Sequence, residues 1–500
     1  MILVGTEAEK FILKEISNHL EGISETLAKY DPIHAVKVWR ETLRAVEELI
    51  NLPGEIEDDE LRNGLLSYRL LPTDPLALMQ IRQALRDRFD GRVAERFCMT
   101  VCQIAAVAVG FKLSGQALDE LTDVDGAIRY FQSRRRQMLA VLYALPNECR
   151  GMERIGRMDT LNVLLPVIEH SSIALSNSYR HIFLLSAIED YSIDVGATAY
   201  TSNYFFQTLN AAFLEPERGG ITEISHRDFD LTLISARPKV DRRKVFSVAE
   251  LCGELMALEA GYAEFQLASA TSFATLPRFI VECARYCRDD YYIELSVGQL
   301  NELMTLCNLP IELQRALVDT GTDYRDHINS FAPFVGIGTT RLSTVTWLSR
   351  FAYHWAGVCL NRVKRYQVRM GFIFEKQVKE ELARQGFDIS EIKRIERQEF
   401  DVIATKNRVI YNVQCKNNRV DLTLMEFNPK VAASYNRRLE KYYAGALRKE
   451  ERREHLLRDE FGLSAVKHVV LSKYPIATRN PRILAFREIA RFGERFGDRE

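Results

Sequence analysis

The residues from Glu399 to Asn418 constrain the fold of this chain more than any other stretch of the sequence. Polar and apolar residues alternate from Glu399 to Ala404 and again from Val409 to Lys416. The residues between these runs, Thr405 to Arg408, have the composition of a turn. The pattern therefore predicts two short strands that form an antiparallel hairpin.

One face of this hairpin is expected to be polar. Side chains alternate between the two faces of a strand, so Glu399 and Asp401 share one face of the first strand. Asn412, Gln414 and Lys416 share one face of the second strand. The opposite faces are apolar and contain Phe400, Val402 and Ala404 on the first strand and Val409, Tyr411, Val413 and Cys415 on the second. A loop of two or four residues would bring the polar sets together, so that a carboxylate, an amide and an ammonium group converge.

A helix is expected before the hairpin, opening at Gly371-Phe372-Ile373-Phe374-Glu375 and ending near Gln385. Glu375, Asp401 and Gln414-Cys415-Lys416 follow one another in an order that resembles the PD-(D/E)xK nuclease superfamily. Within it, the chain is most similar to the Mrr-like restriction endonucleases, which carry Gln in place of the second acid. The resemblance covers about residues 366 to 490. It implies an α/β restriction-endonuclease-like domain with a mixed central sheet, and a role in restriction or anti-phage defence.

These residue types also suit phosphodiester hydrolysis on chemical grounds. The reaction needs a hard cation that neutralises developing charge and activates water, and Mg²⁺, or Mn²⁺ in its place, prefers oxygen ligands. We expect Asp401, the side-chain oxygen of Gln414 and the backbone carbonyl of Cys415 to hold the metal. Lys416 would orient the water or stabilise the pentavalent phosphorus, and Glu375, with Glu399 as a second source, would supply the charge that a neutral Gln lacks. The alternative is that this polar face is the solvated side of an ordinary hairpin.

Charge separates the C-terminal part of the chain from the rest. Residues 361–500 contain 31 Lys and Arg against 20 Asp and Glu, a net charge of +11. The totals of 67 and 68 leave 36 basic and 48 acidic residues in 1–360, a net charge of −12. A basic domain is what binding to a phosphate backbone requires. Much of that charge lies on a helix predicted from Pro429 to Glu460, whose interleaved acids could equally form ion pairs within the helix.

Residues 1–360 are predicted to be mostly helical, in one or two subdomains with a small β insertion near 221–236. Segments with helical periodicity include 74–112, 158–188, 247–268 and 340–362. We therefore expect a multidomain protein in which this helical region precedes the α/β domain of residues 361–500. After the basic helix, Ala465–Ser472 and Arg482–Phe486 are predicted strands, and a final helix should run through Phe492. His468, within the first of these strands, is interpreted as structural rather than catalytic.

Two functions from different classes remain open at this stage. The first is a Mg²⁺-dependent endonuclease whose partner is DNA, with RNA as an alternative substrate, and whose helical region regulates or targets it, through a homo-oligomer or a regulatory partner. The second is a non-catalytic nucleic-acid-binding or scaffold protein that keeps the nuclease-like fold. The stretch Met1-Ile2-Leu3-Val4 is too short for a signal peptide, and the apolar run Phe97–Phe111 is too short to span a membrane. We therefore expect a soluble cytoplasmic protein without a membrane partner.

Overall fold

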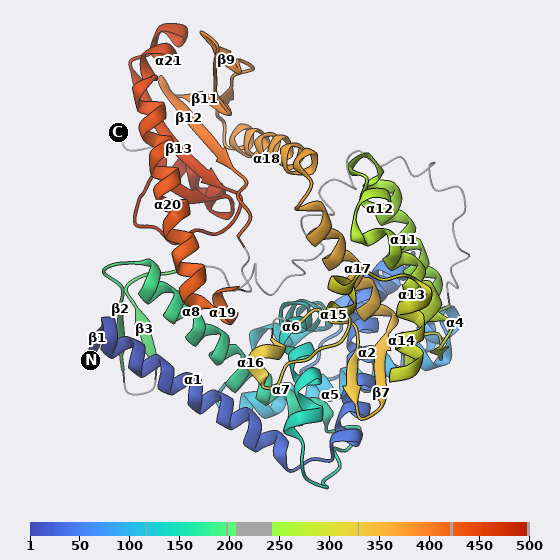
Figure 1. Cartoon of the computed structure of the whole chain (residues 1–500). Coiled ribbons are helices and arrows are strands. Elements are labelled where there is room, and N and C mark those ends of the chain that lie inside the picture. Colours follow the sequence, from blue (N-terminus) through green and yellow to red (C-terminus); the bar gives the residue numbers. More distant parts are fainter. Residues whose placement is uncertain (117, 197–198, 207–242, 329, 421–423, 498–500) are drawn as a thin grey trace. The chain divides into compact units, whose positions relative to one another are not determined.

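The computed structural model describes the chain except residues 117, 197–198, 207–242, 329, 421–423 and 498–500 (Figure 1). The chain forms two compact units. The C-terminal unit consists of Met1–Glu15, Asn177–Leu209 and Val363–Glu500, and the helical unit of Ile16–Ser176 and Asn210–Arg362. Helices dominate the N-terminal part and a mixed sheet organises the C-terminal part, as predicted. The β insertion predicted near 221–236 lies outside the described residues.

The helical unit is built from helices that follow the predicted periodic segments closely. They are α2 (Pro32–Glu55), α3 (Asp59–Leu66), α4 (Pro75–Arg88), α5 (Gly91–Leu113), α6 (Val124–Glu148), α7 (Thr160–Val167), α11 (Val248–Gly261), α12 (Leu267–Ala270), α13 (Leu276–Ala284), α14 (Val297–Leu306), α15 (Ile311–Ala316), α16 (Tyr324–His327) and α17 (Val345–Leu360). Two further helices, α1 (Gly5–Ala28) and α8 (Ile173–Ala187), contribute residues to both units. The segment predicted over 74–112 is two helices, because Asp90 caps the second one by accepting a hydrogen bond from the Arg92 N–H at 3.0 Å.

Among the described residues, α5 is the one helix long and apolar enough to cross a membrane by length and composition. Half of its apolar stretch is buried within the structure, including Phe97, Val101 and Ile104. Core helices of soluble proteins have the same length and composition.

The prediction that a helix starts at residue 340 is wrong. Thr340–Thr344 forms strand β7, and α17 begins after it. This strand belongs to a four-stranded sheet in the order β4-β5-β7-β6, whose other members are β4 (Cys287–Arg288), β5 (Tyr292–Ser296) and β6 (Val335–Ile337). Pairing with neighbours on both sides, together with two β-branched threonines, favours the extended form over the helix.

A five-stranded mixed sheet forms the core of the C-terminal unit. Its order is β14-β13-β12-β11-β8, with β8 (Asp388–Ile389), β11 (Val402–Lys406), β12 (Val409–Lys416), β13 (Ala465–Ser472) and β14 (Ile483–Ala485). The pairs β12–β13 and β13–β14 are parallel, whereas β11 runs antiparallel to both of its neighbours. The strands predicted at Ala465–Ser472 and Arg482–Phe486 are confirmed as β13 and β14. A short 3₁₀ helix, Phe486–Arg491, stands where the final helix was expected.

Helices cover both faces of this sheet (Figure 1). On one face, Phe374, Val378 and Leu382 of α18 (Lys364–Arg384) pack with Tyr411 and Val413. On the other face, the buried residues of α20 (Pro429–Arg452) and α21 (Glu454–Phe461) pack against the sheet, and they include Leu439, Tyr443 and Leu447 with Val470 and Ile483, and Leu456 and Leu457 with Ile403 and Ile410. The short α19 (Leu424–Phe427) precedes α20.

Two helix predictions in this unit need correction. The helix expected to open at Gly371 begins earlier, at Lys364, so that Glu375 lies in its middle rather than in its first turn. The single helix expected from Pro429 to Glu460 is broken at Arg453, whose φ is −110°. The break coincides with a buried guanidinium group that bonds Glu450 and the carbonyl of Glu399.

A single cut at residue 361 does not separate the two units. Strands β1 (Ile2–Val4), β2 (Ser192–Val195) and β3 (Tyr200–Ser202) form a three-stranded antiparallel sheet within the C-terminal unit. The hydroxyl of Tyr204 donates to the carbonyl of Thr478 at 3.0 Å and accepts from its N–H at 2.9 Å. Segments from the first 209 residues thus complete a unit that was expected to start at 361.

Candidate active site

A two-residue turn sets the register of the hairpin. Asn407 and Arg408 connect β11 to β12, and both have positive φ, +52° and +61°. Two left-handed residues in succession make the turn whose twist matches that of the flanking strands. Val402 pairs with Val413, and the same register continued by one residue places Asp401 opposite Gln414. The prediction of an even-numbered loop that brings the polar faces together is therefore confirmed.

Asp401, Gln414 and Lys416 converge at the carboxyl end of β12. The carboxylate oxygen Oδ2 of Asp401 accepts a hydrogen bond from the Cys415 N–H at 2.8 Å. The ammonium group of Lys416 lies 3.9 Å from the same oxygen and donates to Oε1 of Gln414 at 3.1 Å. The side chains of Lys416 and Asp401 are 16% and 22% exposed, so the group is accessible from solvent at this end of the strand.

The two carboxyl groups of the site both have raised pKa values. Burial raises the pKa of Asp401, against the Lys416 ammonium and the Cys415 N–H, which lower it. Burial also raises the pKa of Glu375 to about 7, and the charge of Asp401 adds to the effect. Glu375 therefore lies near Asp401, on the helix that covers the apolar face of the hairpin. A half-buried carboxyl group whose pKa is raised by the charge of a second carboxylate marks a place where a cation would be stabilised.

The donor set suits a hard divalent cation bound largely through water. Among the described residues, no three side chains of His, Cys, Asp or Glu lie close enough to hold a metal by themselves. Mg²⁺ needs fewer than three such side chains, because it usually keeps several water ligands and takes one or two carboxylates from the protein. Asp401, Glu375 and the amide oxygen of Gln414 provide that set. Burial holds the pKa of the Cys415 thiol well above its usual range, so this residue can offer its backbone carbonyl but not a thiolate.

One polar residue of the predicted face, Glu399, lies elsewhere. Glu399 belongs to strand β10 (Gln398–Glu399), which pairs with β9 (Arg394–Ile395), and its side chain is 67% exposed. The first strand of the hairpin is interrupted after it, because Phe400 turns its ring to the face covered by α21 and packs under the guanidinium of Arg453 at 4.2 Å. The prediction that Phe400 joins the apolar face of the hairpin is wrong for this reason.

Asn412 lies on the predicted face but is completely buried in a polar network that the sequence analysis did not identify. Its amide donates to Glu450 at 2.8 Å and lies 3.2 Å from Nδ1 of His468. His468 in turn contacts Glu454 at 2.9 Å, and Arg453 binds Glu450 through two nitrogens. His468 thus links a strand to a helix in the interior, in agreement with its structural interpretation. The spacing of Glu450, Arg453 and Glu454 on one helix face was the signal available in the sequence.

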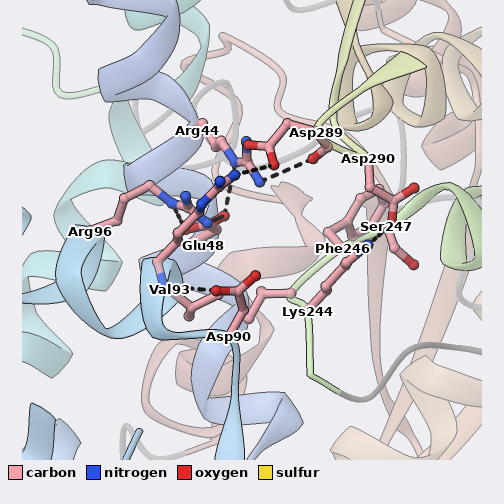
Figure 2. A pocket seen from close by; sticks show the side chains of 12 residues that line it. Arg44, Glu48, Asp90, Val93, Arg96, Lys244, Phe246, Ser247, Asp289 and Asp290 are labelled. Carbon is pink, nitrogen blue, oxygen red and sulfur yellow. Dashed lines mark hydrogen bonds and ion pairs between the residues drawn. The ribbon is translucent and has the colours of Figure 1, made fainter. Parts of the chain in front are cut away.

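A second concentration of charged side chains lies in the helical unit, where Figure 2 shows Arg44 and Arg96 meeting Glu48. Glu48 is 5% exposed and accepts from Nε of Arg44 at 3.0 Å and from Nε and Nη2 of Arg96 at 2.5 and 2.7 Å. Arg44 also donates to Asp289 at 2.6 Å, and Lys244 bonds Asp290 at 2.9 Å. The carboxylates of Glu48, Asp289 and Asp290 in this pocket are paired with cations of the same chain, and that of Asp90 caps α5. We interpret it as an ion-pair network that ties α2 and α5 to the hairpin of β4 and β5.

Comparisons of the chain with protein-family models, with curated proteins and with solved structures found no match.

Glu375→Gln should change how stability depends on pH. The folded state holds the Glu375 proton up to a pKa of about 7, whereas the unfolded chain releases it near the ordinary value of 4.5. Stability of the natural chain therefore falls as pH rises from about 4.5 to 7, and the variant lacks this loss. In EDTA, urea unfolding from pH 5 to 8 should show the variant gaining stability over the natural chain as pH rises. Glu380→Gln, on the exposed side of the same helix, should run parallel to the natural chain. Parallel curves for Glu375→Gln would contradict the buried carboxyl.

Glu48→Gln should destabilise the protein by about 3–5 kcal/mol, because it removes a buried carboxylate that is the counter-charge of Arg96 and, together with Asp289, of the buried Arg44. The matched control is Glu41→Gln on the same helix. Glu41 pairs with Arg157 at 2.6 Å, but the Arg157 side chain is 68% exposed, so the expected loss is below about 1 kcal/mol. Denaturant unfolding of both variants measures the difference. Equal losses would show that the network around Glu48 is not the stabilising element.

Proposed function

We propose that the protein is a Mg²⁺-dependent nuclease that hydrolyses phosphodiester bonds in DNA. The observation that carries the proposal is the convergence of the Asp401 carboxylate, the Gln414 amide and the Lys416 ammonium at the end of β12. A coupled second carboxyl group, Glu375, supports it. The order of these residues along the chain and the mixed sheet that presents them also agree with the resembled superfamily.

The side chains have separable roles in this proposal. Asp401 holds the metal, and the Cys415 N–H fixes one of its oxygens at 2.8 Å, so that the carboxylate is oriented before any ligand arrives. A bound Mg²⁺ supplies neutralisation of the charge that develops on phosphorus and lowers the pKa of a coordinated water. Lys416 is held by Gln414 and lies close to Asp401, where an ammonium group can orient a water molecule or stabilise the oxygens of the phosphoryl group. Glu375 adds the negative charge that Gln414 lacks.

The net charge of +11 on residues 361–500 supports a nucleic acid as the substrate, because cations that displace counterions drive such binding. DNA is preferred to RNA on the resemblance alone, as is a role in restriction or anti-phage defence in the cytoplasm. The helical unit, as the acidic part of the chain, would then regulate or target cleavage, alone, as an oligomer or with a partner.

A second candidate is a non-catalytic nucleic-acid-binding protein with the same fold. The neutral Gln414 favours it, because its oxygen is already bonded to Lys416 and a metal would have to compete for it. The two candidates differ in turnover, not in binding.

Asp401→Asn and Lys416→Ala should each reduce cleavage of DNA by at least about 100-fold, a loss typical of removing one group that acts in the transition state. The assay incubates plasmid, linear DNA and RNA with the full chain in Mg²⁺, Mn²⁺ or EDTA, and EDTA should abolish cleavage. Lys376→Ala is the control, since Lys376 is 67% exposed and its contact with Glu380 is 4.0 Å long. Full activity in Asp401→Asn or Lys416→Ala would reject the assignment, and absence of cleavage by the natural chain under every condition would favour the second candidate.

A further inference from the structure

Helix α20 has two faces of different character. One face is buried on the sheet through residues that include Leu439, Tyr443 and Leu447. The opposite face presents basic side chains that are all exposed, namely Arg437, Arg438, Lys441, Arg448, Lys449 and Arg452. The sequence alone left open whether these cations are neutralised by the acids interleaved with them, and the structure answers this residue by residue.

The acidic side chains of α20 and of the start of α21 bond to groups other than these cations. Glu440 accepts a hydrogen bond from the hydroxyl of Thr478, and Glu451 pairs with Arg482 at 2.6 Å. Glu450 is buried and accepts hydrogen bonds from Arg453 and Asn412. Glu454 pairs with Arg458 and His468. Within the described part of the chain, none of the six exposed cations of α20 forms an ion pair, whereas Lys430 at the start of the helix binds Glu9 at 2.7 Å.

The spacing of these cations matches a polyanion. At 3.6 residues per turn, the six side chains lie within an arc of about 120°, and the helix advances about 22 Å from Arg437 to Arg452. A nucleic-acid strand in helical form carries one phosphate per about 3.4 Å of axis, so this length corresponds to about six phosphates. A row of cations that has no ion-pair partner among the described residues and matches a strand in length is complementary to a sugar–phosphate backbone.

An aromatic ring stands at the edge of this cationic face. Tyr442 is 56% exposed although it is a large apolar side chain in the middle of a packed helix. On the same side of the helix, Arg438 lies one turn before it and Lys449 two turns after it, and Arg438 itself covers the ring of Tyr435 at 5.6 Å. An exposed ring between cations is the arrangement in which proteins stack unpaired bases while binding the phosphates on either side.

The middle of α20 lies beside the candidate active site. The hydroxyl of Tyr443 is 3.3 Å from Oγ of Ser472 and donates to Asn418 at 3.4 Å. Ser472 is the partner of Lys416 in the parallel pairing of β12 and β13. Tyr443 lies on the buried face of α20, so this helix borders the end of β12, where Lys416 lies, and its exposed cations project from the opposite side of the helix.

We propose that the exposed face of α20 binds a single-stranded stretch of nucleic acid, with phosphates on its six cations and an unpaired base on Tyr442. The proposal rests on the proposed function for the fate of the strand, but binding itself needs neither metal nor catalysis. In this proposal, stacking on Tyr442 gives the preference for an unpaired strand, and the cations around Tyr442 supply the electrostatic affinity.

The test measures binding of the full chain to a fluorescein-labelled 30-nucleotide single-stranded DNA in EDTA, by anisotropy from 50 to 200 mM salt. The triple variant R438Q/K441Q/K449Q should bind more weakly, and the slope of log K against log salt should become shallower by about 2, since each phosphate contact to a single strand contributes about 0.7. The control R384Q/R458Q/R495Q removes the same charge from residues paired with Glu381, Glu454 and Glu488 and should keep the slope of the natural chain. An equal change in the control would overturn the proposal, because net charge rather than α20 would then set the affinity.

Tyr442→Ala should weaken single-strand binding by about 5- to 100-fold without changing the salt slope, while Tyr442→Phe keeps the affinity and binding to a duplex of equal length changes little. Unchanged single-strand affinity in Tyr442→Ala would refute the stacking role. Asp401→Asn separates this inference from the proposed function, because it should bind the strand in EDTA as the natural chain does yet fail to cleave it. If Asp401→Asn loses cleavage but still binds the strand, the result supports both the proposed function and this inference. If the α20 triple variant binds as tightly as the natural chain, this inference alone is rejected.

Discussion

The pairing of β11 with β12 is the constraint on which the C-terminal unit depends. A slip of one residue in this pairing would turn Asn412, Gln414 and Lys416 toward the apolar core under α18, and Tyr411 and Val413 toward the face covered by α20 and α21. The turn at Asn407 and Arg408 prevents the slip, because both residues adopt left-handed conformations that fit a two-residue connection. The parallel addition of β13 then extends the sheet from a fixed register. The same pairing decides which residues reach the solvent at the strand end. One register therefore places both the candidate site and the core.

Polar groups buried between the sheet and α20 have a different role from those at the strand end. Four residues contact one another through polar groups in the interior, namely Glu450, Arg453, Asn412 and His468. Arg453 also lies over the ring of Phe400 and donates a hydrogen bond to the carbonyl of Glu399. A buried network of this kind orients the elements that it joins more than it adds stability, because the cost of removing charges from water offsets much of their attraction. It positions the start of β11 and hence Asp401, and it engages Glu450 and Glu454, so that these two acids pair with groups other than the exposed cations of α20.

The local sequence pattern was sufficient to predict the structure of a segment that has one buried and one polar face and pairs with neighbours close in sequence. The alternation in Val409–Lys416 and the apolar run in Ala465–Ser472 predicted β12 and β13 to the residue, and the periodicity of the N-terminal part predicted most of its helices. The same reasoning failed where a distant partner decides the outcome. Thr340–Thr344 is extended because of β5 and β6, and Phe400 leaves its predicted face because Arg453, far along the chain, covers it. In the candidate site, the convergence of Asp401, Gln414 and Lys416 was predictable from register, whereas the burial of Asn412 depends on Glu450 and His468 and has no local signature.

The three-stranded sheet of β1, β2 and β3 imposes an order of events during synthesis. Ile2 is translated before its partner Asp194, which follows only after the residues between them have left the ribosome, and Tyr204 is likewise translated long before Thr478. Contacts between residues so far apart in sequence form slowly, since the intervening chain must first be brought to closure. Throughout that interval Leu3, which is buried in the finished protein, belongs to a strand without a neighbour. A ribosome that pauses before residue 190 would extend the time for which strand β1 has no partner.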